Sequence, residues 1–155
     1  ETEGFITPER LKKYSPSPII LSEQFKKGCK PKVYLAGPFF TLAQLWLIEE
    51  ARKNLQDLGL EVFSPYHDVG KGNAEDVVDK DLEGIHKCDL LFAIADGMDS
   101  GTIYEIGYAR AINKPVVVYA ENESEENLKM MEGSDCKILK DYVTAIYHTL
   151  WTAIT

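Results

Sequence analysis

The sequence has few cysteines and no long apolar run. Cys29, Cys88 and Cys136 are widely spaced and form no Cys-x-x-Cys pair, a pattern that predicts reduced thiols and neither a disulfide framework nor a zinc site. No apolar stretch approaches the ~18 residues that a membrane-spanning helix needs, and the first ten residues lack the basic and apolar regions of a secretory signal. We therefore expect a cytoplasmic protein without a membrane partner.

Basic residues are also scarce. Lys and Arg number 17 against 25 Asp and Glu, which gives a formal net charge of -8. Because binding to nucleic acids is driven by clustered Lys and Arg, this balance argues against a nucleic-acid polymer as partner. The single basic cluster, residues 26–32, is typical of an exposed segment. A small, uncharged or weakly charged ligand suits the composition better.

Two common nucleotide-binding signatures are missing. Neither G-x-G-x-x-G nor G-x-x-x-x-G-K-[ST] occurs, so a classical dinucleotide fold or phosphate-binding loop is not indicated. The three histidines, His67, His86 and His148, are scattered along the chain and do not predict a metal site. We expect neither a metal nor a cofactor.

What the sequence does contain is a regular alternation of strands and helices within a length of 155 residues, typical of one domain. Residues 1–31 are interpreted as an N-terminal extension with a short helix over 7–14, and residues 32–155 as the domain. Short apolar runs predict strands at 32–39, 60–66, 90–96 and 115–121, and a fifth near 134–139. Helical spacing is found over 41–59, 74–88, 102–113 and 139–154.

This order predicts an α/β fold. Strands that are apolar throughout and alternate with helices form a parallel sheet covered on both faces. We expect a three-layer sandwich of four to five strands, flavodoxin-like or Rossmann-like. In such folds ligands bind at the carboxyl ends of the strands, near the point where the strand order reverses. Residues 36–40, 64–68 and 96–101 occupy those positions.

Asp81 is a carboxylate in an apolar pattern. In the helix predicted over 74–88 it lies three residues after Val78 and four before Ile85, on the apolar face. A buried carboxylate is costly unless something binds or pairs with it. Two alternatives to a bound partner stay open: the face emerges into solvent at the helix end, or Asp81 caps a neighbouring loop.

Glu105 is compatible with two roles. Thr102 and Glu105 match a capping box, in which the glutamate bonds back to its own backbone. Alternatively, Glu105 lies in the first helical turn at the carboxyl edge of the sheet, where the helix dipole favours an ionised, nucleophilic carboxylate. With Asp99 just before it, three acids are expected to converge: Asp81, Asp99 and Glu105. A pair of carboxylates, one ionised and one protonated, is suited to cleaving a glycosidic bond.

Three segments in this order resemble the nucleoside 2-deoxyribosyltransferases. They are "VYLAGPFF" at 33–40, "DLEGI" at 81–85 and "DGMDSGTIYEIGYA" at 96–109, and the similarity extends over residues 32–121. The resemblance implies that Glu105 attacks C1′ of the sugar and forms a glycosyl-enzyme that an incoming base resolves. It also implies that Asp81 exchanges a proton with the base and that Tyr34 orients Glu105.

The same resemblance implies a binding site for a nucleoside and a nucleobase. Asp99 holds the sugar hydroxyls, and Phe40 or its neighbour Phe39 packs against the nucleoside. Three residues of the same loops, Gly37, Ser100 and Gly101, are expected to line the site. Members of the family are homo-oligomers whose sites borrow residues from a neighbouring subunit, so we expect a dimer or a larger assembly.

The sequence also departs from the family. Pro38, Phe39 and Phe40 stand where transferases often carry Gly-Trp-Phe. Some relatives hydrolyse nucleoside 5′-monophosphates, but Asp99 would repel a phosphate, so unphosphorylated nucleosides are expected. Base exchange is the leading hypothesis, and hydrolysis of a nucleoside, of a nucleoside 5′-monophosphate or of the nicotinamide–ribose bond of NAD is the alternative. A different class, a non-catalytic nucleotide-sensing domain of a larger protein, also stays open because the chain begins at Glu1.

Overall fold

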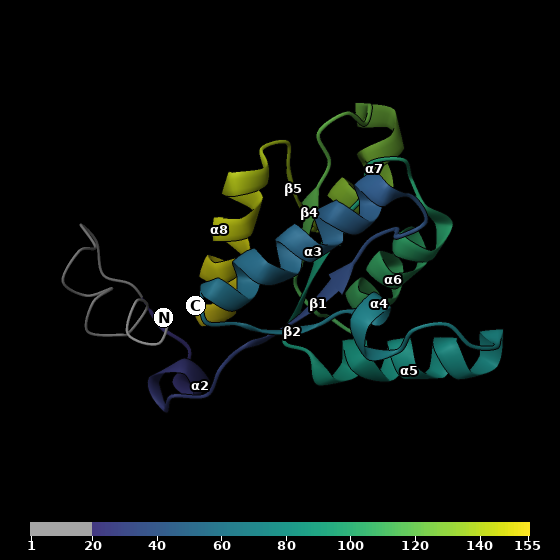
Figure 1. Ribbon diagram of the computed structural model, residues 1–155. Coiled ribbons are helices and arrows are strands. Elements are labelled where there is room, and N and C mark those ends of the chain that lie inside the picture. Colours follow the sequence, from purple (N-terminus) through teal and green to yellow (C-terminus); the bar gives the residue numbers. More distant parts are fainter. Residues whose placement is uncertain (1–19) are drawn as a thin grey trace.

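The computed structural model describes residues 20–155 and contains a sheet of five strands with helices on both faces (Figure 1). The strands are β1 (Lys32–Ala36), β2 (Glu61–Phe63), β3 (Leu90–Ile94), β4 (Val116–Tyr119) and β5 (Lys137–Leu139). Their order is β2-β1-β3-β4-β5, and every neighbouring pair is parallel. The predicted α/β fold and its fifth strand are confirmed. The helix predicted over residues 7–14 lies outside the described residues.

The helices form two layers. They are α2 (Glu23–Lys26), α3 (Leu42–Asp57), α4 (Pro65–Asp68), α5 (Ala74–Lys87), α6 (Ser100–Ala111), α7 (Glu125–Gly133) and α8 (Tyr142–Ile154). In Figure 1, α3 and α8 lie on one side of the sheet and α5 and α6 on the other. No helix among residues 20–155 has the length and apolar character to span a membrane.

Each face of the sheet has its own apolar core. Val33 and Leu35 of β1 pack with α3 and α8, whereas Tyr34 and Ala36 point to the opposite face, toward α5 and α6. Side chains alternate between the faces of a strand, so a strand covered on both sides must be apolar at every position. This is why the strand segments of the sequence show no polar alternation. Leu21, which precedes α2, is also buried in the α3 and α8 core.

Local capping fixes the starts of the two helices that frame the site. Thr41 and Gln44 form a capping box at the start of α3, and the side chain of Asn73 accepts a hydrogen bond from the amide of Asp76 at the start of α5. Each bond satisfies an amide that has no partner inside its helix. The start at Asn73 agrees with the sequence-based prediction.

The strand order reverses between β1 and β3. The chain leaves β1 through α3 on one face and returns in β2, and it leaves β3 through α6 on the other face and returns in β4. The chain therefore leaves β1 and β3 toward opposite faces of the sheet, and open α/β folds bind ligands at the carboxyl edge beside such a reversal. Tyr34 of β1 and Glu105 of α6 lie on the two sides of this reversal.

Candidate active site

The centre of the candidate site is a contact between Tyr34 and Glu105. The Tyr34 hydroxyl donates a hydrogen bond to the Glu105 Oε2 atom. The Tyr34 side chain is 0% exposed, and its ring stacks on Phe63 of β2 with centroids 5.4 Å apart. Glu105 is thus held by a residue from the middle of the sheet, and its carboxylate is directed away from its own helix terminus.

The helix that carries Glu105 is capped by another residue. Asp99 is the N-cap of α6, and its Oδ2 atom accepts hydrogen bonds from the Thr102 amide at 2.9 Å and the Thr102 hydroxyl at 3.0 Å. The capping box between Thr102 and Glu105 is therefore excluded. Because α6 begins at Ser100, Glu105 lies in the second turn and is free for another role.

Burial dominates the electrostatics of Glu105. The pKa of its carboxyl is raised to about 8, chiefly by desolvation; the Tyr34 hydrogen bond lowers it, and the nearby Asp81 and Asp99 carboxylates add to the rise. The ionised state expected from the helix dipole is therefore not the resting state near pH 7. The same burial and the Glu105 charge raise the pKa of Tyr34 far above its ordinary value, so that Tyr34 remains a hydrogen-bond donor.

Asp81 lies close enough to affect both residues electrostatically. It is half-buried on α5, and its Oδ1 atom is buried without a hydrogen-bond partner among residues 20–155. Desolvation raises the pKa of Asp81 to about 6. A buried polar atom without a partner is uncommon in folded proteins and, beside a second acid with a raised pKa, is typical of a functional site.

The loop between β3 and α6 forms the next part of the site. It turns through two residues with positive φ, Gly97 at 86° and Met98 at 50°, before Asp99 caps the helix. Asp99 is half-buried, whereas Ser100 and Gly101 are exposed in the first turn of α6. The structure thus places all three predicted substrate-binding residues of this loop on the rim beside Glu105, with Asp99 also needed for the helix start.

The loop after β1 contributes a glycine and two aromatic rings. A Cβ atom on Gly37 would lie 2.9 Å from Ile48 Cδ1 and 3.2 Å from Ile94 Cβ, so this glycine is required by packing. Phe39 packs against the α3 and α8 core, while Phe40 is 75% exposed and stacks on Phe39 with centroids 5.7 Å apart. Of the two candidates, Phe40 is the ring available to a ligand and Phe39 supports it.

Sequence reasoning did not assign roles to the residues that follow β2. Tyr66 of α4 contacts Phe39 with ring centroids 5.3 Å apart, and His67 bonds to Ser64 and Glu49. The signal available was their position, since residues 64–68 form one of the three segments expected at the carboxyl edge. Among residues 20–155, no group of three or more His, Cys, Asp or Glu side chains is placed to hold a metal ion.

Comparisons with known proteins identify the family of the chain. A family model described as nucleoside 2-deoxyribosyltransferase matches residues 33–136. The match covers more than half of the chain and includes Tyr34, Asp81, Asp99 and Glu105. The chain belongs to the nucleoside 2-deoxyribosyltransferase family.

Individual relatives support the assignment. A 2-deoxyribosyltransferase from the psychrotolerant bacterium Bacillus psychrosaccharolyticus is 34% identical, with a TM-score of 0.64 over 77% of this chain and 95% of that one. A 2-desoxiribosyltransferase from Leishmania mexicana has a TM-score of 0.62 at 19% identity, over 77% of this chain and 97% of that one, which shows a shared fold. An uncharacterized protein of Ureaplasma parvum serovar 3 is 34% identical over 101 residues, 56% of this chain and 64% of that protein's length.

Proposed function

We propose that this protein cleaves the N-glycosidic bond of a nucleoside and transfers the sugar to another nucleobase, with Glu105 as the nucleophile. The observation that carries the proposal is the partly buried Tyr34–Glu105 hydrogen bond together with the unpartnered Oδ1 atom of Asp81. A nucleophilic carboxylate and a proton-carrying carboxyl are the two groups that glycoside cleavage needs. This arrangement supplies both.

The reaction has two balanced steps. In the first, a carboxylate oxygen of Glu105 bonds to C1′ while the bond from C1′ to the base nitrogen breaks, and Asp81 gives its proton to the departing base. In the second, a nitrogen of the incoming base bonds to C1′, the ester bond to Glu105 breaks, and Asp81 takes up the proton that the new base loses. Positive charge develops on the sugar in each step, and the Glu105 carboxylate stabilises it.

The number of protons that Asp81 and Glu105 hold near neutral pH suits this mechanism. With a pKa of about 6 at Asp81 and about 8 at Glu105, the pair holds a single proton near pH 7. Reaction requires that proton on Asp81 and a negative charge on Glu105. The hydrogen bond from Tyr34 favours this distribution because it stabilises the ionised form of Glu105.

Asp99 and the exposed ring of Phe40 complete the proposed substrate site. Asp99 accepts a hydrogen bond from a sugar hydroxyl, and Phe40 covers the apolar part of the nucleoside. The carboxylate of Asp99 disfavours a phosphate on the same sugar, which supports an unphosphorylated nucleoside as substrate. Ser100 and Gly101, in the first turn of α6, and Gly37, after β1, are proposed to line this site.

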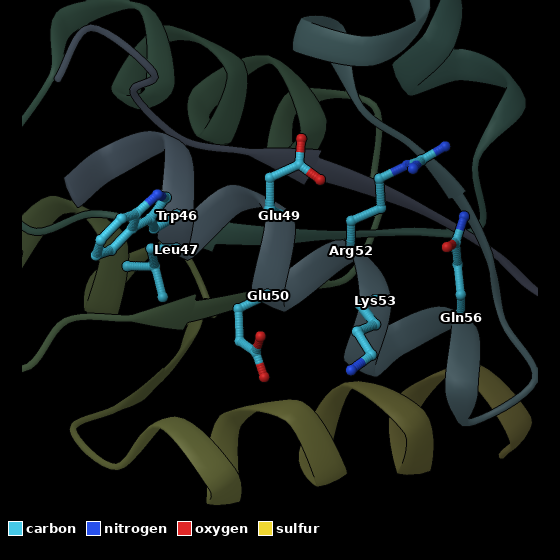
Figure 2. A pocket seen from close by; sticks show the side chains of 7 residues that line it. All are labelled: Trp46, Leu47, Glu49, Glu50, Arg52, Lys53 and Gln56. Atoms are coloured by element: carbon cyan, nitrogen blue, oxygen red, sulfur yellow. The ribbon is translucent and has the colours of Figure 1, made fainter. Parts of the chain in front are cut away.

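We also propose that the active assembly is a homo-oligomer formed through α3. Figure 2 shows the side chains along this helix, from Trp46 at one end to Gln56 at the other, around a surface hollow of about 820 Å³. Trp46 is 67% exposed, which is unusual for tryptophan and common for interface anchors. Acidic Glu49 and Glu50 precede basic Arg52 and Lys53, so two antiparallel copies of α3 would pair opposite charges across a two-fold axis.

One assay separates transfer from hydrolysis. Deoxyadenosine is incubated with and without free cytosine, and the products are separated chromatographically. We expect deoxycytidine and adenine when cytosine is present, and little free sugar in its absence. Release of free sugar at the same rate with or without cytosine would instead establish a hydrolase, and the same assay with NAD tests release of nicotinamide.

A second experiment separates an enzyme from a nucleotide sensor. Glu105→Ala is expected to abolish turnover while circular dichroism and the melting temperature show an intact fold. A sensor would show no turnover in either protein and unchanged ligand affinity after the substitution. For the assembly, Trp46→Glu is expected to convert an oligomer into a monomer in light scattering, and a wild-type monomer would refute the role of α3.

A further inference from the structure

We propose that Tyr66 forms a wall of the nucleobase subsite beside Phe40, and that a Glu49–His67–Ser64 chain holds it in place. This inference rests on the proposed function and deepens it: the base is recognised chiefly by its ring face, so that purine nucleosides bind more tightly than pyrimidine nucleosides. Neither Tyr66 nor His67 has a role in the mechanism described above.

The aromatic cluster has the shape of a stacking surface. Phe39 is its inner ring, and its two partners, Phe40 and Tyr66, lie 5.7 Å and 5.3 Å from it by ring centroids. Both partners remain accessible, at 75% for Phe40 and 39% for Tyr66. Two exposed rings supported by one packed ring offer flat apolar surfaces at the carboxyl edge of the sheet, and such surfaces favour stacking of another aromatic ring.

This cluster follows the same two strands, β1 and β2, that hold Tyr34 and its partner Phe63. Tyr34, which holds Glu105, is paired in register with Phe63 at the end of β2 and stacks on its ring. Tyr66 follows Phe63 by three residues. A nucleoside with its C1′ atom at Glu105 extends several ångströms through its base, so its base can reach the rings that follow β1 and β2.

His67 is bound at both of its ring nitrogens. Its Nδ1 atom lies 2.8 Å from Ser64 Oγ, and its Nε2 atom lies 2.6 Å from Glu49 Oε1. Because a carboxylate only accepts hydrogen bonds, Nε2 carries a proton, and in the neutral ring Nδ1 accepts from the Ser64 hydroxyl. With both nitrogens occupied, His67 positions its neighbours and does not exchange protons with the substrate.

The Glu49–His67–Ser64 chain has a structural reason. The helix α4 contains only four residues, and a helix of one turn is not stable by itself in water. Ser64 is 0% exposed and anchors the start of α4, and its amide donates to Asp68 Oδ2 at 2.8 Å. His67 adds a link from α4 to Glu49 of α3, and its ring packs edge-on against Tyr66 with centroids 4.9 Å apart. Tyr66 is therefore fixed on both sides.

Stacking also predicts a preference among bases. Every base has a ring face, so an aromatic wall accepts all of them by stacking. A purine presents two fused rings and covers more of the wall than a pyrimidine. Recognition by this cluster is therefore broad, with tighter binding of purine nucleosides.

The test measures binding in a protein that cannot turn over. Titration calorimetry compares deoxyadenosine and deoxycytidine on Glu105→Gln alone and in combination with Tyr66→Ala, Tyr66→Leu or Tyr66→Phe. We expect Tyr66→Ala and Tyr66→Leu to weaken deoxyadenosine binding about tenfold and to reduce the purine preference, with Tyr66→Phe unchanged. Tyr147→Ala, at an exposed tyrosine of α8, is the matched control and is expected to have no effect.

His67 is tested in the active enzyme. We expect His67→Ala to raise KM for the nucleoside and to leave both limbs of the pH profile of kcat in place. A lost limb would make His67 an acid–base group and overturn its positioning role. If Glu105→Gln binds nucleosides and the Tyr66 variants bind equally well, the inference is wrong and the proposed function stands. If neither wild type nor Glu105→Gln binds a nucleoside, the proposed function fails as well.

Discussion

The hydroxyl of Tyr34 donates a hydrogen bond to the carboxylate of Glu105 across a separation of 71 positions in the chain. The bond joins β1, on one side of the reversal in strand order, to α6, which follows β3 on the other side. It fixes the position of the carboxylate and stabilises its ionised form. The proposed chemistry of the site depends on this pair and on Asp81.

Tyr34→Phe removes this bond and leaves the ring packing on Phe63 intact. Since the bond lowers the pKa of Glu105, we expect its loss to move the alkaline limb of the pH profile of kcat/KM to higher pH. The maximum falls by roughly tenfold to a hundredfold, the effect of one hydrogen bond to a charged group. The measurement is kcat/KM for base exchange against pH.

Tyr119→Phe is the matched control for that variant. Tyr119 is also a buried tyrosine whose hydroxyl bonds to a glutamate, Glu121 at 2.5 Å, away from the proposed machinery. We expect an unchanged pH profile. Equal profiles for Tyr34→Phe and wild type would show that Tyr34 does not act on Glu105.

The pH dependence of the wild-type enzyme follows from the two acids. Below about pH 6 both Asp81 and Glu105 are protonated and the nucleophile is lost, and above about pH 8 both are ionised and the acid is lost. We therefore expect a bell-shaped kcat/KM profile with a maximum near pH 7. A rate that is constant from pH 5 to 9 would contradict the two-acid mechanism.

Asp81→Asn separates the two limbs. The variant keeps the shape of the side chain but has no proton to give, so we expect activity to fall by about 10²–10⁴ and the alkaline limb to disappear. The remaining limb reports the ionisation of Glu105 alone, and its pKa falls below about 8 because the Asp81 charge no longer raises it. Glu83→Gln, at an exposed residue of α5 paired with Lys87 at 2.6 Å, is the control and should retain the wild-type profile.

Burial of Glu105 also predicts a pH-dependent stability. Between its ordinary value of 4.5 and about 8, the unfolded chain ionises this carboxyl while the folded protein retains the proton. The free energy of unfolding therefore falls as pH rises through this window. Glu105→Gln removes the penalty, so we expect it to be more stable than wild type at pH 9, by on the order of 2 kcal/mol, and equal to it at pH 4.

Chemical denaturation of both proteins at the two pH values measures this difference. The Glu83→Gln variant serves again as control, because Glu83 is exposed on the surface of α5. Parallel stability curves for Glu105→Gln and wild type would mean that Glu105 is ionised and solvated in the folded protein.

Two helical glycines give a contrasting pair for the packing of the site. A Cβ atom on Gly84 would lie 2.6 Å from the ring of Phe63, whereas one on Gly107 would meet no atom within 4 Å. We expect Gly84→Ala to destabilise the protein by about 1–3 kcal/mol through overpacking, with displacement of the Phe63 ring that supports Tyr34. Gly107→Ala should stabilise α6 by about 0.5–1 kcal/mol. Urea unfolding of both variants measures whether each substitution lowers or raises the free energy of unfolding.

Much of the fold was predictable because strand and helix periods are local properties. The start of α5 at Asn73 and the strand at residues 137–139 were both predicted. The helices α2, α4 and α7 were missed. A four-residue helix such as α4 has no period to detect, and it depends on distant partners such as Glu49. The apolar positions of α7, Leu128 and Met131, form too short a stripe to stand out among its polar residues.

The sequence predicted which residues form the site, but it did not predict the contacts between them. The pattern identified Asp81 as a carboxylate on an apolar face, but only the fold shows that its Oδ1 atom is buried and unpartnered. At the start of α6, Asp99 and Thr102 are both good capping residues, and sequence spacing alone does not choose between them. The choice matters because capping by Asp99 leaves Glu105 for Tyr34. A contact across 71 positions leaves no local signal.

The most direct test of the proposed mechanism is to find the sugar on Glu105. The enzyme is mixed with deoxyinosine, quenched with acid within one turnover, and digested for mass spectrometry. We predict a peptide that contains Glu105 and carries the added mass of one deoxyribosyl group, and its absence in Glu105→Gln. Base exchange that proceeds at the wild-type rate in Glu105→Gln, or a sugar attached to a different residue, would contradict the mechanism.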